Sequence, residues 1–104
     1  MIARTWRGTV DIARAEDYHR YLLATGVPDL RATPGNLGVY VFRRTEGDCA
    51  HFEMVSLWES LDSIRAFAGE PVDRARYYPE DAEFLRELAP TCTHYEVLVE
   101  PESP

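Results

Sequence analysis

The stretch His51–Gly69, HFEMVSLWESLDSIRAFAG, decides the fold of this chain. Its first half alternates in polarity as far as Trp58, which predicts a strand. Ser60 then predicts a helix N-cap, with Asp62 in the first turn and Gly69 beyond the end. A large aromatic side chain therefore lies where the strand passes into the helix. The indole of Trp58 can wall a pocket between sheet and helices, or it can be an ordinary core residue, as most large aromatics are.

Working outward from this stretch, the same patterns predict the other elements. Alternating segments bounded by turn residues predict strands, and apolar residues at helical spacing predict helices. The expected order is a strand at 2–9, a helix at 13–25, a strand at 37–44, a strand at 49–58, a helix from 60 to 67 or 68, a helical segment from 79 to 90 and a strand at 91–100.

This βαββαβ order predicts an α+β fold of the ferredoxin-like type, with one antiparallel sheet. The first strand should lie between the third and fourth, and helices should cover one face of the sheet. The other face is left bare, and a second copy of the chain commonly covers such a face in small domains. We expect a single domain over residues 1–100 and a loose tail over 101–104.

Composition excludes several classes of function. The net charge of −7 argues against nucleic-acid binding and against an anionic membrane surface. All eleven basic residues are arginines, so chemistry that needs a lysine amine is excluded. No apolar run is long enough for a membrane-spanning helix, and the N-terminus lacks a signal-peptide pattern. We therefore expect a cytoplasmic protein. The chain has no phosphate-binding loop or hydrolase motif.

The strand face expected beneath the helices carries the candidate pocket. Strand periodicity groups two indoles and one guanidinium with apolar side chains, and such a slot suits a planar, weakly acidic ligand. The alternative is an ordinary core from which Arg4 extends to solvent. By register, this face combines Ile2, Arg4, Trp6 and Gly8 with Phe52, Met54, Ser56 and Trp58, and with Tyr95, Val97 and Val99 of the last strand.

Two adjacent tyrosines, Tyr77 and Tyr78, follow the helix that Gly69 ends. On a connecting segment they can cap the mouth of a pocket, and a tyrosine hydroxyl can donate to a carbonyl or enolate oxygen. The alternative is that both rings only pack on the surface of a loop.

Two pentads, 49–53 and 92–96, share the order Cys-x-His-x-Glu. The period of two places the Cys, His and Glu of each pentad on one face, which we expect to be the bare one. The two strands should lie roughly 10 Å apart, too far to share one tetrahedral zinc. Neighbours along one strand lie roughly 6.5–7 Å apart and could share an ion only by leaning together. We therefore expect a polar ladder around Arg7 and no metal site.

The chain resembles the antibiotic biosynthesis monooxygenase family. The resemblance rests on Trp58-Glu59-Ser60 at the strand–helix junction, on Pro34-Gly35-Asn36 before the second strand, and on the βαββαβ order. It covers nearly the whole chain, although each motif is short. It implies a dimeric α+β barrel of two ferredoxin-like units packed sheet to sheet. It also implies, for some members, oxidation of anthrone- or quinol-like aromatics without a cofactor, and for others degradation of haem.

Only part of the family's site carries over. Four residues mark its anthrone oxygenases, and only the strand tryptophan is kept, as Trp58. The Asn of the family falls on Met54, the Tyr on Ile64 and the Arg near Tyr78. The three residues that mark the haem-degrading branch, an Asn, a Trp and the iron-binding His, fall on Trp6, Phe67 and Tyr77, and none is kept. Haem degradation is therefore not expected.

The resulting hypothesis is a cofactor-independent monooxygenase that acts with O₂ on a small planar aromatic, as a homodimer. Trp58 and Trp6 would stack on the substrate, Arg4 would stabilise its enolate, and Tyr77 or Tyr78 would bind a carbonyl. The remaining lining would come from Phe52, Met54, Ile64 and Phe67. The competing hypothesis is a non-catalytic dimeric domain that binds a small molecule or has a structural role.

Overall fold

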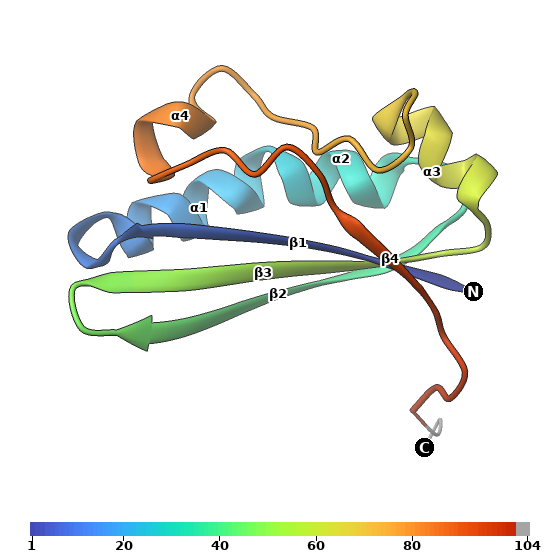
Figure 1. Cartoon of the computed structure of the whole chain (residues 1–104), viewed down its shortest axis with the longest axis horizontal. Helices are drawn as coiled ribbons and strands as arrows, with labels where there is room; N and C mark the ends of the chain where they lie inside the picture. Colours follow the sequence, from blue (N-terminus) through green and yellow to red (C-terminus); the bar gives the residue numbers. More distant parts are fainter. Residues whose placement is uncertain (102–104) are drawn as a thin grey trace.

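The computed structural model describes residues 1–101 (Figure 1). Most of the expected tail therefore lies outside the described residues. The elements in chain order are β1 (Ile2–Asp11), η1 (Ile12–Arg14), α1 (Ala15–Ala24), α2 (Gly26–Ala32), β2 (Asn36–Glu46), β3 (Cys49–Trp58), α3 (Leu61–Ala68), α4 (Asp81–Phe84) and β4 (Thr93–Glu96).

The four strands form one antiparallel sheet in the order β2-β3-β1-β4. β1 is central between β3 and β4, as the sequence predicted, and the α+β ferredoxin-like fold is confirmed. The pairing of β1 with β3 runs from Ile2 opposite Trp58 to Asp11 opposite Cys49, without a register shift. This long, regular pairing fixes which side chains of the two strands share a face.

The helices lie on one side of the sheet and leave the other side open (Figure 1). Two buried clusters lie between the layers. One joins β1 and β3 to α1 through Val10, Phe52 and Tyr18, and the other joins Trp58 to Ile64 of α3 and Leu30 of α2. These clusters hold the helices at the two ends of the sheet.

The segment after the second helix is less helical than expected. Only α4, a single turn, forms where the sequence predicted a helix to Pro90. Leu85 instead makes an antiparallel bridge with Val10, and the backbone N–H of Arg86 donates to the carbonyl of Thr9 at 2.9 Å. The helix ends here because β4 pairs only with the first half of β1, so the edge of β1 near Val10 is free to pair with Leu85.

The last strand is also shorter than expected, at four residues. Glu96 pairs with Ile2, and the N–H of Val97 donates to the carbonyl of Met1 at 3.1 Å. β1 has no residues left beyond that point, so the rest of the expected strand has no partner. Leu98 and Val99 are both 86% exposed.

The predicted faces of this last strand were wrong. His94 pairs with Arg4, which points toward the helices, so His94 lies on the helix side and not on the bare side. Tyr95, expected beneath the helices, is instead 55% exposed. Alternation in the sequence fixes which residues share a face but not which face it is, and the pairing with β1 decides that.

Candidate functional site

A pocket lies between the sheet and the helical layer. It is a slot whose empty volume is about 570 Å³, including the open mouth. Its lining combines aromatic rings with a few charged and polar groups. The lining residues are Arg4, Trp6, Tyr18, Leu22, Thr25, Gly26, Leu30, Met54, Ser56, Phe67, Arg76, Tyr77, Tyr78, Asp81 and Cys92.

Arg4 provides a buried positive charge in this slot. Its side chain is 4% exposed and donates to the carbonyls of Val72 and Arg74, each at 2.7 Å. Among the described residues no carboxylate lies within 4.0 Å of its guanidinium nitrogens. Burial lowers the pKa of Arg4, and the nearby Cys92 and Asp73 oppose that shift. A buried cation held by neutral carbonyls favours an anionic ligand.

His94, which the period-two pattern of residues 92–96 predicted on the bare face, is the third partner of Arg4. Arg4 Nη1 lies 2.9 Å from Nε2 of His94. Arginine can only donate, so Nε2 is the acceptor and the ring proton lies on Nδ1. Burial, and then the charge of Arg4, lower the pKa of His94. The neutral ring therefore positions Arg4, and its acceptor nitrogen is already engaged.

Trp6 and Tyr77 form one wall of the slot. Trp6 Nε1 donates to the hydroxyl of Tyr77 at 2.9 Å, and that hydroxyl donates to the carbonyl of Ala89 at 2.6 Å. The rings meet edge to face, with centroids 6.3 Å apart. Burial raises the pKa of Tyr77. Since its hydroxyl proton is already donated, Tyr77 holds the indole in place and is not free to bind a substrate carbonyl.

Tyr78, Phe67 and Arg76 lie at the exposed end of the slot. The guanidinium of Arg76 lies 4.7 Å from the ring centroid of Phe67 and 5.6 Å from that of Tyr78. The hydroxyl of Tyr78 donates to Asp29, and burial, with this hydrogen bond, raises the pKa of Tyr78 to about 12. Tyr77 and Tyr78 both line the pocket, and both hydroxyls already have protein acceptors.

Three predicted site residues lie in the core instead. Trp58 and Ile64 are fully buried and Phe52 is 2% exposed, and none of them lines the slot. The prediction that the indole of Trp58 stacks on a substrate in the pocket was wrong, because Leu30, Ile64 and Phe67 pack around this indole. It still reaches the pocket indirectly, since Trp58 Nε1 donates to the hydroxyl oxygen of Ser56, a lining residue, at 2.8 Å.

Asp81 was missed as a site residue. It is 5% exposed, lines the slot, and accepts the backbone N–H of Tyr78 at 2.6 Å. Burial raises the pKa of Asp81, and the nearby Glu80 adds to the shift. In the sequence it is only the second of two acids, after Glu80, at the start of a predicted helix. Its burial beside Tyr18 depends on how the 69–80 segment crosses the helices, which no local pattern reveals.

The slot thus combines a buried cation, a buried carboxylate with a raised pKa, and aromatic walls. Perturbed ionisable groups that share a cleft are typical of binding and catalytic sites. The sequence profile of the antibiotic biosynthesis monooxygenases matches residues 1–75, which include β1, β2, β3 and α3. The chain belongs to this family. No curated protein matches the chain in sequence.

Several solved structures share the fold of this family member. A candidate antibiotic biosynthesis monooxygenase from Bacteroides thetaiotaomicron is 17% identical, with a TM-score of 0.66 over 99% of this chain and 94% of that one. The heme-degrader MhuD from Mycobacterium tuberculosis, with two hemes bound, is 20% identical, with a TM-score of 0.61 over 98% and 100%. Rv0793 from the same organism is 18% identical, with a TM-score of 0.61 over 97% and 98%. At these identities the likeness concerns the fold alone.

No helix in residues 1–101 is long and apolar enough to cross a membrane.

Proposed function

We propose that this family member is a cofactor-independent monooxygenase for a planar, weakly acidic aromatic of the quinol, anthrone or polyketide type. The observation that carries the proposal is that Arg4 and Asp81 both line one aromatic slot. A base and an anion-stabilising group are what oxidation of such a substrate by O₂ requires of a protein.

The proposed reaction begins with proton transfer from the substrate to the carboxylate of Asp81. The pKa of Asp81 is raised, so its conjugate base accepts a proton more readily than an ordinary aspartate. The anion of the substrate is then held by Arg4, which has neutral hydrogen-bond partners and no direct counter-ion among the described residues. Exclusion of water from the slot strengthens this interaction.

Oxidation of the bound anion follows. The anion passes one electron to O₂, the resulting radical pair combines to a peroxide anion, and the proton held by Asp81 returns to it to give a hydroperoxide. Loss of water from the peroxide leaves a new carbonyl, so that one CH₂ and one O₂ give one C=O and one H₂O. Trp6, Met54 and Phe67 supply flat apolar surface for the ring system.

An anaerobic titration followed by aeration tests this proposal. A model anthrone is mixed with the protein without O₂, and formation of the bound anion is followed by absorbance before air is admitted. We expect Arg4→Met to weaken anion formation and to lower turnover about 100-fold, the usual scale for a lost oxyanion partner. Arg7→Met is the matched control, since the side chain of Arg7 is 80% exposed and lies outside the slot.

The same assay separates the alternatives. Turnover that is equal in the wild type and Arg4→Met contradicts the proposed role of Arg4. Anthrone binding with no product after aeration supports a non-catalytic binding domain. Hemin is titrated in parallel, because MhuD shares the fold. Among the described residues no histidine lines the slot, and the hydroxyl of Tyr77 is engaged by Trp6 and Ala89, so we expect no haem breakdown.

We also propose that the chain works as a homodimer, with the bare faces of two sheets packed together. The fold leaves this face without helices (Figure 1), and it carries exposed aromatic side chains, including Tyr40, Phe42 and Tyr95. Several exposed aromatic side chains on one face are typical of an interface.

A further inference from the structure

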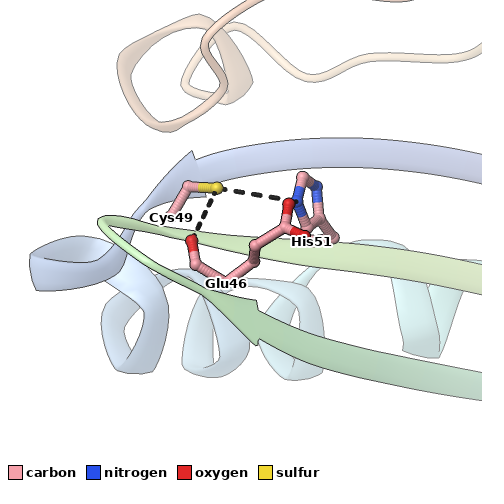
Figure 2. Close-up of side chains that lie close together, drawn as sticks. All are labelled: Glu46, Cys49 and His51. Atoms are coloured by element: carbon pink, nitrogen blue, oxygen red, sulfur yellow. Dashed lines mark hydrogen bonds and ion pairs between the residues drawn. The ribbon is translucent and has the colours of Figure 1, made fainter.

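Three potential metal ligands meet at the tight turn between β2 and β3 (Figure 2). Glu46 and Cys49 are directly paired across the two strands, and His51 follows on the same face of β3. Nε2 of His51 lies 3.5 Å from Sγ of Cys49 and 3.1 Å from Oε1 of Glu46. The three donor atoms all lie within 4.8 Å of one another.

Neighbouring groups already orient two of these ligands. Oγ1 of Thr9, on β1, lies 3.0 Å from Nδ1 of His51 and leaves Nε2 directed toward the other two donors. Nη1 of Arg44 lies 3.1 Å from Oε2 of Glu46 and leaves Oε1 directed toward His51. Contacts of this kind to the far atom of a ligand are typical of protein metal sites.

We propose that Glu46, Cys49 and His51 form a binding site for a zinc-class divalent cation. Zinc takes thiolate, imidazole and carboxylate ligands together, at bond lengths of about 2.0–2.3 Å. In a tetrahedron with such bonds, the sulfur and nitrogen donors lie about 3.5 Å apart. The distance from Sγ of Cys49 to Nε2 of His51 is 3.5 Å, so this pair needs little movement to bind one ion.

The charge balance of the cluster suits a divalent ion. Binding requires the thiol of Cys49 to release its proton to solvent; that proton now points to the carbonyl of Glu46, 3.2 Å from the sulfur. The thiolate and the carboxylate then neutralise the ion, while Nε2 of neutral His51 supplies a lone pair. In the single chain His51 lines an open groove beside β1, so the ion can reach the site before two copies pair, and the fourth position is left to water.

Titration of the untagged, metal-free full chain with Co²⁺ tests the site. We expect one Co²⁺ per chain, with a thiolate-to-cobalt charge-transfer band that Zn²⁺ abolishes by displacement. Cys49→Ser should remove the band, and His51→Ala should weaken binding more than about 100-fold, because both lose a direct ligand. Thr9→Val should weaken binding about 10-fold, the scale found when a ligand loses its orienting partner.

Cys92→Ser is the matched control, because it removes the other free thiol of the chain and should leave the charge-transfer band unchanged. Circular dichroism of each metal-free variant shows whether the fold is retained. The proposal is overturned if the wild type shows no thiolate band, or if folded Cys49→Ser binds Co²⁺ as tightly as the wild type. Neither result bears on the anthrone assay, since the cluster lies outside the slot.

Discussion

At the scale of single residues, the site depends on two charges that burial disfavours. Burial lowers the pKa of Arg4 and raises that of Asp81, so each is held less firmly in its charged form than it would be in water. Such groups weaken the fold and are commonly kept for function. An anionic substrate would compensate Arg4, and a transferred proton would neutralise Asp81.

The variant Asp81→Asn tests whether the buried charge of Asp81 lowers the stability of the fold. Because the pKa of Asp81 is raised in the folded protein above its ordinary value of 3.8, the folded state binds more protons than the unfolded state between the two pKa values. The free energy of unfolding of the wild type therefore falls as the pH rises through that window, and stays reduced above it. We expect Asp81→Asn to gain stability relative to the wild type as the pH is raised from 3 to 7, measured by urea unfolding.

The same variant should lose activity. A general base commonly contributes about 10²–10⁴-fold, and its loss should also remove the rise of kcat/KM with pH that ionisation of Asp81 produces. Asparagine can still accept the N–H of Tyr78, so the backbone contact at 2.6 Å has a replacement. A pH–rate profile that keeps its acid limb in the variant would assign the base to another group.

Gly8 sets the position of the Trp6 indole. A Cβ at Gly8 would lie 2.4 Å from Trp6 and 2.7 Å from Leu85. We expect Gly8→Ala to lower the free energy of unfolding by about 1–3 kcal/mol and to shift the tryptophan fluorescence, because the indole must move. Gly26→Ala is the control, since its Cβ would meet only Met54 at 3.8 Å; equal losses in both variants would refute the steric explanation.

At the scale of elements, α3 depends on its N-cap. The side chain of Ser60 accepts the backbone N–H of Ser63 at 3.2 Å, as the sequence predicted. We expect Ser60→Ala to lower the free energy of unfolding by about 1 kcal/mol in urea titrations, whereas Ser60→Asp should preserve stability, because aspartate caps as well as serine. A loss of the same size in Ser60→Asp would show that the cap is not the cause.

The elements that could be predicted are those with strong local signals. The Ser60 cap and the alternation of β3 each have a local physical cause, and each appears where expected. The face of β4 and the burial of Asp81 depend on distant partners, so periodicity could not decide them. The proposed metal site also depends on a partner outside the strand, because Glu46 pairs with Cys49 across the hairpin, which periodicity along one strand does not reveal.

At the scale of the whole molecule, one side of the sheet remains uncovered. Tyr40 and Phe42 on β2 stack on this side, with ring centroids 5.6 Å apart and planes 8° from parallel. Val55 of β3 pairs with Tyr40, and in the next row Ala3 of β1 pairs with Leu57 of β3 and Tyr95 of β4, so apolar side chains occur on all four strands of this side. A second copy could bury all of these rings without any change in the fold.

Phe42→Arg tests this assembly. Phe42 is 52% exposed, so the change leaves the core of one chain intact. In a symmetric dimer it removes one phenyl ring from each copy, about 1.5–3 kcal/mol apiece, which corresponds to a dimer roughly 10²–10⁴-fold weaker. Light scattering during size-exclusion chromatography should then show a dimer for the wild type and a monomer for the variant.

Leu23→Arg is the control, because Leu23 is 54% exposed but lies on α1, on the helical side. A wild type that elutes as a monomer at every concentration would overturn the sheet-to-sheet dimer. If Leu23→Arg alone dissociated the dimer, the interface would lie on the helical side instead.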